Sequence, residues 1–97
     1  MNMNEMLKKA KRMQAEMEKE EKLIEGQEFT VEKQGIVVVM DGHRKIKSLK
    51  LNEALIDPED PELIQDLVML AVNEAIDKVN EAFDEMSAKF SGNGFPF

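Results

Sequence analysis

The basic residues near the start of the chain have a type and spacing suited to binding phosphate groups. Within the first fifteen residues, four cations face a single acid, Glu5; the cations are Lys8, Lys9, Lys11 and Arg12. Lys45 and Lys47 form a second, smaller basic group near the middle of the chain. Such side chains bind nucleic-acid phosphates as point charges and do not read sequence. No aromatic residue lies among them, so stacking on single-stranded bases is not expected.

The other ionisable residues do not form the patterns of catalytic or metal sites. His43 is the only histidine and cysteine is absent, so we expect His43 to be an exposed loop side chain. The acidic segment 57–62 lacks the ligand spacing of a calcium loop and fits turn and helix-capping chemistry. The five glycines are scattered and form no phosphate-binding loop. We therefore predict no enzyme activity, no cofactor and no metal.

The charge of the chain is unevenly distributed. The net charge is -7, which by itself argues against general nucleic-acid binding. Residues 1–24 carry six basic and five acidic side chains, residues 25–52 five and four, and residues 53–97 two and eleven. The acid is therefore concentrated in the C-terminal part, which could receive another protein.

Residues 1–25 have the pattern of a helix with two different faces. Apolar residues recur at steps of three, four and seven from Met3 through Met6, Ala10, Met13 and Met17 to Ile24, which is typical of a heptad seam. The opposite face is basic and includes Lys8, Lys11, Arg12, Lys19 and Lys22. For Lys19 and Lys22 an ordinary solvated face is favoured, because Glu16, Glu18, Glu20 and Glu21 lie nearby.

Residues 27–52 change to the period of strands and predict an antiparallel meander. Phe29 and Val31 alternate with polar residues, and Gln34-Gly35 predicts a tight turn. The apolar run 36–40 predicts a strand buried on both faces. Asp41-Gly42 is a strong hairpin signal, and a return strand from about 44 to 51 changes parity, which predicts a bulge near Lys47-Ser48.

Residues 60–90 predict a second long helix. Asp60-Pro61 is a cap followed by the residue tolerated at the first helical position, and an apolar stripe runs to Phe90. Gly92, Asn93 and Gly94 predict its end and a flexible tail, 91–97. At 1.5 Å per residue the helix would be roughly 45 Å long, so it must project from a compact body or pack against a partner.

The apolar central strand also bears on assembly. A single domain, 1–97, with helices on one side of three strands leaves the second face of Ile36, Val37, Val38, Val39 and Met40 uncovered. A second copy of the chain would cover it by two-fold pairing. The alternative is that both helices of one chain flank its own sheet. Since no transmembrane or signal segment is evident, we expect a soluble cytoplasmic protein.

The chain resembles the YbaB/EbfC family of bacterial nucleoid-associated proteins over nearly its whole length. The specific part is the segment Ile56 to Val68, followed by Ala71 and Asn73-Glu74-Ala75. Met13-Gln14, the Gly35 to Val39 run, Asp41-Gly42 and the ending Gly94 to Phe97 add support. The resemblance implies an α+β homodimer of α-β-β-β-α chains whose long helices project like tweezers. It also implies binding to duplex DNA with little sequence preference, and a location in the cytoplasm and nucleoid.

Two hypotheses about function follow from the sequence. In the first, a homodimer binds duplex DNA through Lys8, Lys9, Lys11 and Arg12 near the helix tips, with help from Lys45 and Lys47. In the second, the Met-rich seam or the acidic C-terminal helix binds another protein, because methionine surfaces adapt to different partners. Neither requires a membrane or a small-molecule substrate.

Overall fold

The computed structural model describes residues 2–91, and the order of its elements confirms the predicted α-β-β-β-α class. The elements are α1 (Met3–Glu25), β1 (Glu28–Lys33), β2 (Ile36–Asp41), β3 (Ile46–Leu51), the short 3-10 helix η1 (Glu53–Leu55) and α2 (Pro61–Ser91). The two helices begin and end within two residues of their predicted bounds. Beyond Ser91, the predicted flexible tail and its glycine stop signals lie outside the described residues.

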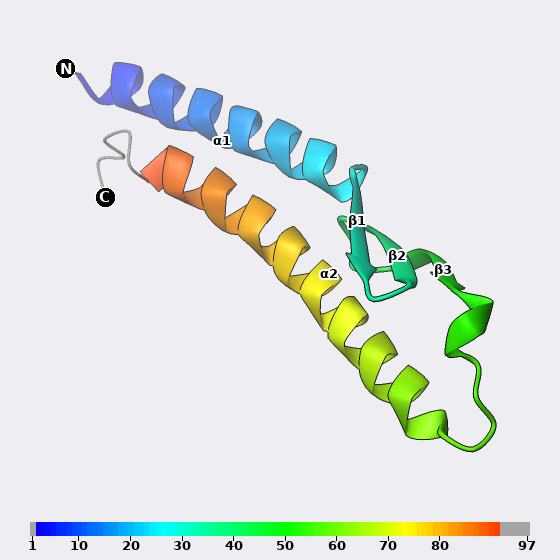
Figure 1. Ribbon diagram of the computed structural model, residues 1–97. Coiled ribbons are helices and arrows are strands. Elements are labelled where there is room, and N and C mark those ends of the chain that lie inside the picture. Colours follow the sequence, from blue (N-terminus) through cyan, green and yellow to red (C-terminus); the bar gives the residue numbers. More distant parts are fainter. Residues whose placement is uncertain (1, 92–97) are drawn as a thin grey trace.

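Helix α2 is the axis on which the other elements are arranged. The sheet lies against its middle, and α1 runs antiparallel along its C-terminal half, so the start of α1 and the end of α2 share one end of the molecule (Figure 1). The molecule measures 71 × 19 × 13 Å with a radius of gyration of 19.7 Å, whereas a compact domain of this length has about 13 Å. The long helix therefore projects from the body, as its length predicts.

The core forms where α2 meets β1 and β2. Residues at steps of four along α2, from Leu67 through Ala71 and Ala75 to Val79, are buried against Phe29, Val31 and the inner side chains of β2. Ala71, Ala75 and Val79 have no exposed surface. Because these side chains are small, the helix backbone can lie close to the sheet.

The sheet has the order β1-β2-β3 with both pairs antiparallel. The turn between β1 and β2 places Gln34 at φ 49° and Gly35 at φ 94°, the positive values that a two-residue type I′ turn requires. Between β2 and β3, Val39 pairs with Ser48 but Met40 pairs with Ile46, so Lys47 is an extra residue. The predicted tight turn and bulge are both confirmed.

Strand β2 differs from its prediction on one face. Ile36, Val38 and Met40 point toward α2 and are buried, whereas Val37 and Val39 are only half-buried. The outer neighbours of these valines are polar: Thr30 and Ser48 flank Val39, and Glu32 and Lys50 flank Val37. An apolar run in one strand therefore does not make the whole outer face apolar, because cross-strand neighbours decide the character of a face.

Strand β3 begins at Ile46, two residues after the predicted start at about residue 44, so the loop between β2 and β3 is longer than predicted. Arg44 N donates to Asp41 O, at 3.0 Å, and Arg44 has φ 65°, so the loop is a tight turn followed by a left-handed residue. Gly42 is buried against the end of α1, where its N–H donates to Glu25 O. A Cβ on Gly42 would lie 1.9 Å from Ile24 O. This glycine therefore serves close packing between the hairpin and α1.

Helix α1 packs on α2 of the same chain (Figure 1). Its half-buried residues include Ala10, Met13, Met17 and Ile24 of the predicted seam, yet none of its residues is fully buried. Glu20 occupies the skipped seam position and forms an ion pair with Lys89 of α2. Polar as well as apolar contacts therefore join the helices.

Candidate nucleic-acid interface

The first turns of α1 form the tip of the molecule and carry the predicted phosphate-binding cations. Asn2 caps the helix, its Oδ1 accepting a hydrogen bond from Glu5 N at 2.9 Å. An asparagine cap of this kind favours a helix that starts at the next residue, Met3. The four tip cations, Lys8, Lys9, Lys11 and Arg12, therefore lie in the second and third turns of α1. Met13 and Phe90 of α2 line the same groove between the helices, and Figure 1 shows the start of α1 extending past the end of α2.

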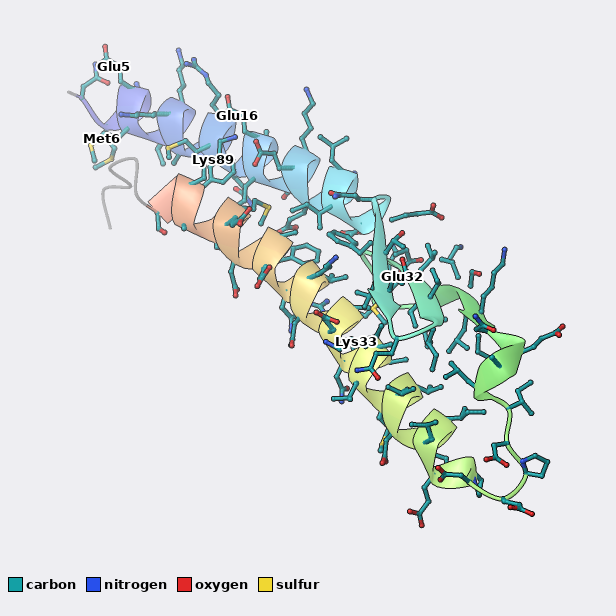
Figure 2. The ribbon with its side chains drawn as sticks, in the orientation of Figure 1. Glu5, Met6, Glu16, Glu32, Lys33 and Lys89 are labelled. Carbon is teal, nitrogen blue, oxygen red and sulfur yellow. The ribbon has the colours of Figure 1, made fainter. Side chains whose placement is uncertain are left out.

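The tip cations are exposed and unpaired within residues 2–91. Lys8, Lys9, Lys11 and Arg12 are all exposed, and none joins an ion pair or a side-chain hydrogen bond in that part of the chain. Figure 2 shows Glu5 and Met6 on different sides of the first turns, with Met6 toward α2. The charged groups can therefore meet phosphates without first breaking an internal ion pair.

Lys45 and Lys47 are exposed but lie at the other end of α1. They belong to the hairpin whose Gly42 packs on Ile24 and Glu25. Along the helix axis, Arg12 and Glu25 are about 20 Å apart at 1.5 Å per residue. The structure therefore does not bring these two lysines together with the tip cations.

The hairpin loop itself is organised by Asp41. Its Oδ1 accepts hydrogen bonds from His43 N and Lys45 N, at 2.9 and 3.0 Å. These bonds, chiefly the one from Lys45, and the nearby positive charges lower the pKa of Asp41. His43 is exposed, as predicted, and its Nε2 lies 3.6 Å from the Glu25 carboxylate, so it joins the loop to α1.

Arg44 is a cation that the sequence patterns did not single out, and its side chain binds another element of the same chain. Its Nε and Nη2 donate to Asn80 Oδ1 at 3.0 and 2.6 Å, and its guanidinium lies 5.2 Å from the centre of the Phe83 ring. This contact joins the hairpin loop to α2. No local signal predicts it, because the two sides are 36 residues apart.

The surface of α2 has the opposite charge to the tip. Six acids on it are exposed: Glu62, Asp66, Asp77, Glu81, Asp84 and Glu85. Both of its lysines bind other elements, Lys78 Nζ donating to Thr30 O at 2.9 Å and Lys89 pairing with Glu20. Figure 2 shows Lys89 between the two helices. These acids would repel nucleic-acid phosphates at the first turn of α2 and along its C-terminal part.

The Met-rich seam is partly used and partly free. Met13 and Met17 are half-buried toward α2, whereas Met3, Met6 and Leu7 are 75%, 44% and 55% exposed. An open groove of about 440 Å³ between the helices is lined by Met13, Glu16, Lys19, Glu20, Leu23, Lys89 and Phe90. The exposed apolar residues and the groove are compatible with binding of another protein.

The predicted dimer residues of β2 divide into two sets. Ile36, Val38 and Met40 are 0%, 0% and 1% exposed inside the protomer, so only Val37 and Val39 have surface left for a partner. The larger exposed apolar side chains of the sheet are Ile46 and Leu49 on β3, at 48% and 38%.

Residues 2–91 hold neither a cluster of metal-ligating residues nor a membrane-spanning helix. No group of three or more His, Cys, Asp or Glu residues between 2 and 91 could hold a metal ion. Neither described helix combines the length and the apolar character needed to cross a membrane.

Comparison with known proteins agrees with this geometry. The model of the YbaB/EbfC DNA-binding family matches residues 1–94. The chain is 68% identical over 91 residues to nucleoid-associated protein MARTH_orf159 of Metamycoplasma arthritidis, covering 94% of this chain and 96% of that protein. It is 47% identical over 97 residues to a nucleoid-associated protein of Mycoplasmopsis pulmonis, covering 100% and 97%. With nucleoid-associated protein LBA0378 of Lactobacillus acidophilus, identity is 38% over 93 residues, covering 94% and 84%. The chain therefore belongs to the YbaB/EbfC DNA-binding family.

Proposed function

We propose that this protein binds duplex DNA in the bacterial nucleoid as a homodimer with little sequence preference. The observation that carries the proposal is the exposed group of Lys8, Lys9, Lys11 and Arg12 near the start of α1, which forms no ion pair within residues 2–91, in a member of a family named for DNA binding. Contacts from lysine and arginine to phosphates fix position but carry no sequence information. Lys45 and Lys47 would add a second, weaker group of contacts near the body.

The test is an electrophoretic shift titration with a duplex of arbitrary sequence at low and moderate salt. We expect a shift at low salt that weakens as salt rises, because phosphate binding releases counterions. The triple variant Lys8→Glu, Lys9→Glu, Arg12→Glu should abolish the shift while leaving the fold intact. The control is Lys33→Glu with Lys50→Glu, which changes charge on the sheet, away from the tip.

Two results would contradict the proposal in different ways. Absence of binding by the natural protein at low salt would remove DNA as its partner. A shift retained by the triple variant would mean that the DNA site lies elsewhere on the molecule.

A second copy of the chain is proposed to cover the apolar surface beside β3. Helix α2 packs on β1 and β2, which leaves Ile46 and Leu49 exposed although their cross-strand partners Met40 and Val38 are buried. The flank of α2 on this side carries Met69, which is 57% exposed and lies three helical turns before Asn80, the residue that binds Arg44. These exposed apolar side chains support an interface on β3 and α2, next to the predicted residues 36–40.

The interface can be tested by light scattering in solution. Ile46→Lys with Leu49→Lys should convert a dimer into a monomer, because two charges would replace apolar contacts. Leu63→Lys with Leu70→Lys is the matched control on the other flank of α2, where both leucines are also exposed. A monomeric natural protein at micromolar concentration would exclude the dimer, and an unchanged dimer in the first variant would place its interface elsewhere.

A protein-binding role is the second candidate, and the free apolar end of α1 favours it. Met3, Met6 and Leu7 are exposed near the start of α1, and Met13 of the same helix lines the groove between the helices. An apolar partner segment could extend the contacts that Met13 and Met17 make with α2. A failure to bind duplex at low salt would favour this role over the first.

A further inference from the structure

Five cations line the outer face of α1. For two of them, Lys19 and Lys22, the sequence favoured an ordinary solvated position with no binding role. Lys8, Lys11, Arg12, Lys19 and Lys22 lie within about 60° of Lys8 around the helix at 3.6 residues per turn. We call these five the outer basic row. All are exposed, and none forms an ion pair among residues 2–91. Glu5 is the only acid in the same sector.

One of the four acids expected to neutralise Lys19 and Lys22 is engaged elsewhere: Glu20 pairs with Lys89 of α2. Glu16 lines the same groove as Lys19, and Glu18 is exposed. Glu21 is half-buried and lies on the far side of α1 from Lys8. The acids near Lys19 and Lys22 therefore neutralise these lysines less than their closeness in the sequence predicts.

The row also has a length that suits a duplex. From Lys8 to Lys22 the helix rises about 21 Å, which corresponds to about six base pairs. It begins at the tip and ends near the hairpin that carries Lys45 and Lys47, because Gly42 packs on Ile24 and Glu25. The row thus spans the gap between the two predicted basic groups.

The acidic surface of α2 disfavours DNA binding on that side of the helix pair. The exposed face of α2 carries six acids, while Lys78 and Lys89 bind Thr30 and Glu20. A duplex that contacted both helices equally would meet attraction on one and repulsion on the other. One orientation remains favourable, with the duplex against α1 and away from α2.

The geometry points to a DNA site that extends along the outer face of α1, with Lys19 and Lys22 as further phosphate-binding residues. The inference rests on the proposed function, because it concerns how the same duplex is bound. Ala15 is exposed and lies in the gap of the row between Arg12 and Lys19. A lysine there would complete the row.

The deciding experiment adds and removes charges at matched positions. Binding of a fluorescein-labelled 20-base-pair duplex is followed by anisotropy over a range of salt concentrations, and the slope of log affinity against log salt is measured. Ala15→Lys should steepen the slope by about 0.9, the value for one added phosphate contact, for each α1 of the dimer that contacts the duplex. Ala88→Lys, an equal charge change at an exposed position among the acids of α2, should leave the slope unchanged.

Charge removal gives the converse result. Lys19→Gln with Lys22→Gln should flatten the slope by about 1.8 for each α1 that contacts the duplex. Lys33→Gln with Lys50→Gln should not, although both pairs remove two charges per protomer. If Ala15→Lys and Ala88→Lys behave alike, or the Lys19 and Lys22 changes have no effect while the tip triple variant abolishes binding, this inference is wrong and the proposed function stands. No binding by the natural protein would overturn both.

Discussion

Helices α1 and α2 differ both in what they bury and in the charge that they expose. Six residues of α2 are buried and its free surface is acidic, whereas no residue of α1 is buried and its outer face is basic. Helix α2 is held along its length by the sheet and by α1. Helix α1 is held by half-buried side chains and by its C-terminal end, where Gly42 packs on it.

This difference separates the tasks of stability and recognition between the helices. Changes along α2 alter the packing that keeps the body folded, while changes on the outer face of α1 alter charge without removing core contacts. The start of α1 can carry repulsive like charges because its outer face makes no core contacts, whereas the end of α1 packs on the body through Ile24. The following predictions test this separation.

The largest effect is expected at the base of α1. Gly42→Ala should destabilise the protein by about 3 kcal/mol, since its Cβ would lie 1.9 Å from Ile24 O and 2.5 Å from Glu25 Cα. Urea unfolding followed by circular dichroism measures the loss, and hydrogen exchange should show α1 exposed before the α2 core. Gly26→Ala is the control, because its Cβ would lie at an ordinary 3.7 Å from Lys22 O; equal losses in both variants would contradict the close-packing role of Gly42.

The same substitution on the two helices should give different results. Ala75→Leu should cost about 2 kcal/mol through overpacking, because Ala75 has no exposed surface between α2 and the sheet. Ala15→Leu on the exposed face of α1 should change stability by less than about 0.5 kcal/mol. Thermal or urea unfolding of both variants measures the contrast. Similar losses would show that α1 is as deeply involved in folding as α2.

A smaller effect is expected from the contact between the hairpin loop and α2. Arg44→Ala should cost about 1 kcal/mol, because it removes the hydrogen bonds to Asn80 Oδ1 and the stacking on Phe83. Asn80→Ala should cost a similar amount, and the double variant should lose less than the sum. Strict additivity in unfolding measurements would mean that the two side chains do not interact in solution.

The smallest effect concerns pH at the base of α1. The pKa of Asp41 is lowered, chiefly by the hydrogen bond from Lys45 N, so its carboxylate should stabilise the loop above the ordinary pKa of about 3.9. This contribution should be lost as pH falls through the lowered folded-state pKa. Titration of the Asp41 carboxyl carbon by NMR should therefore give a midpoint below 3.9. A midpoint at or above that value would contradict the loop hydrogen bonds.

Several local features could be predicted from sequence because they depend on neighbours in the chain. Pro61 marks the start of α2, Gln34-Gly35 the tight turn and Lys47 the bulge, as the structure confirms. The tip cations could be singled out as candidates for the same reason, since they lie close together on one helix. The contact of Arg44 with Asn80 and the packing of Gly42 on Ile24 were not predicted, because each joins residues far apart in sequence.

The sequence alone determined the order of the elements, their approximate ends and the opposite charges of the two helices, since periodicity, turn residues and charge are local properties. Only the tertiary structure decided which side chains of β2 are already used and which acids are engaged near Lys19 and Lys22. The physical reason is that burial and ion pairing depend on distances between elements. The same reasoning applies to the outer face of the sheet, where polar residues on β1 and β3 surround Val37 and Val39.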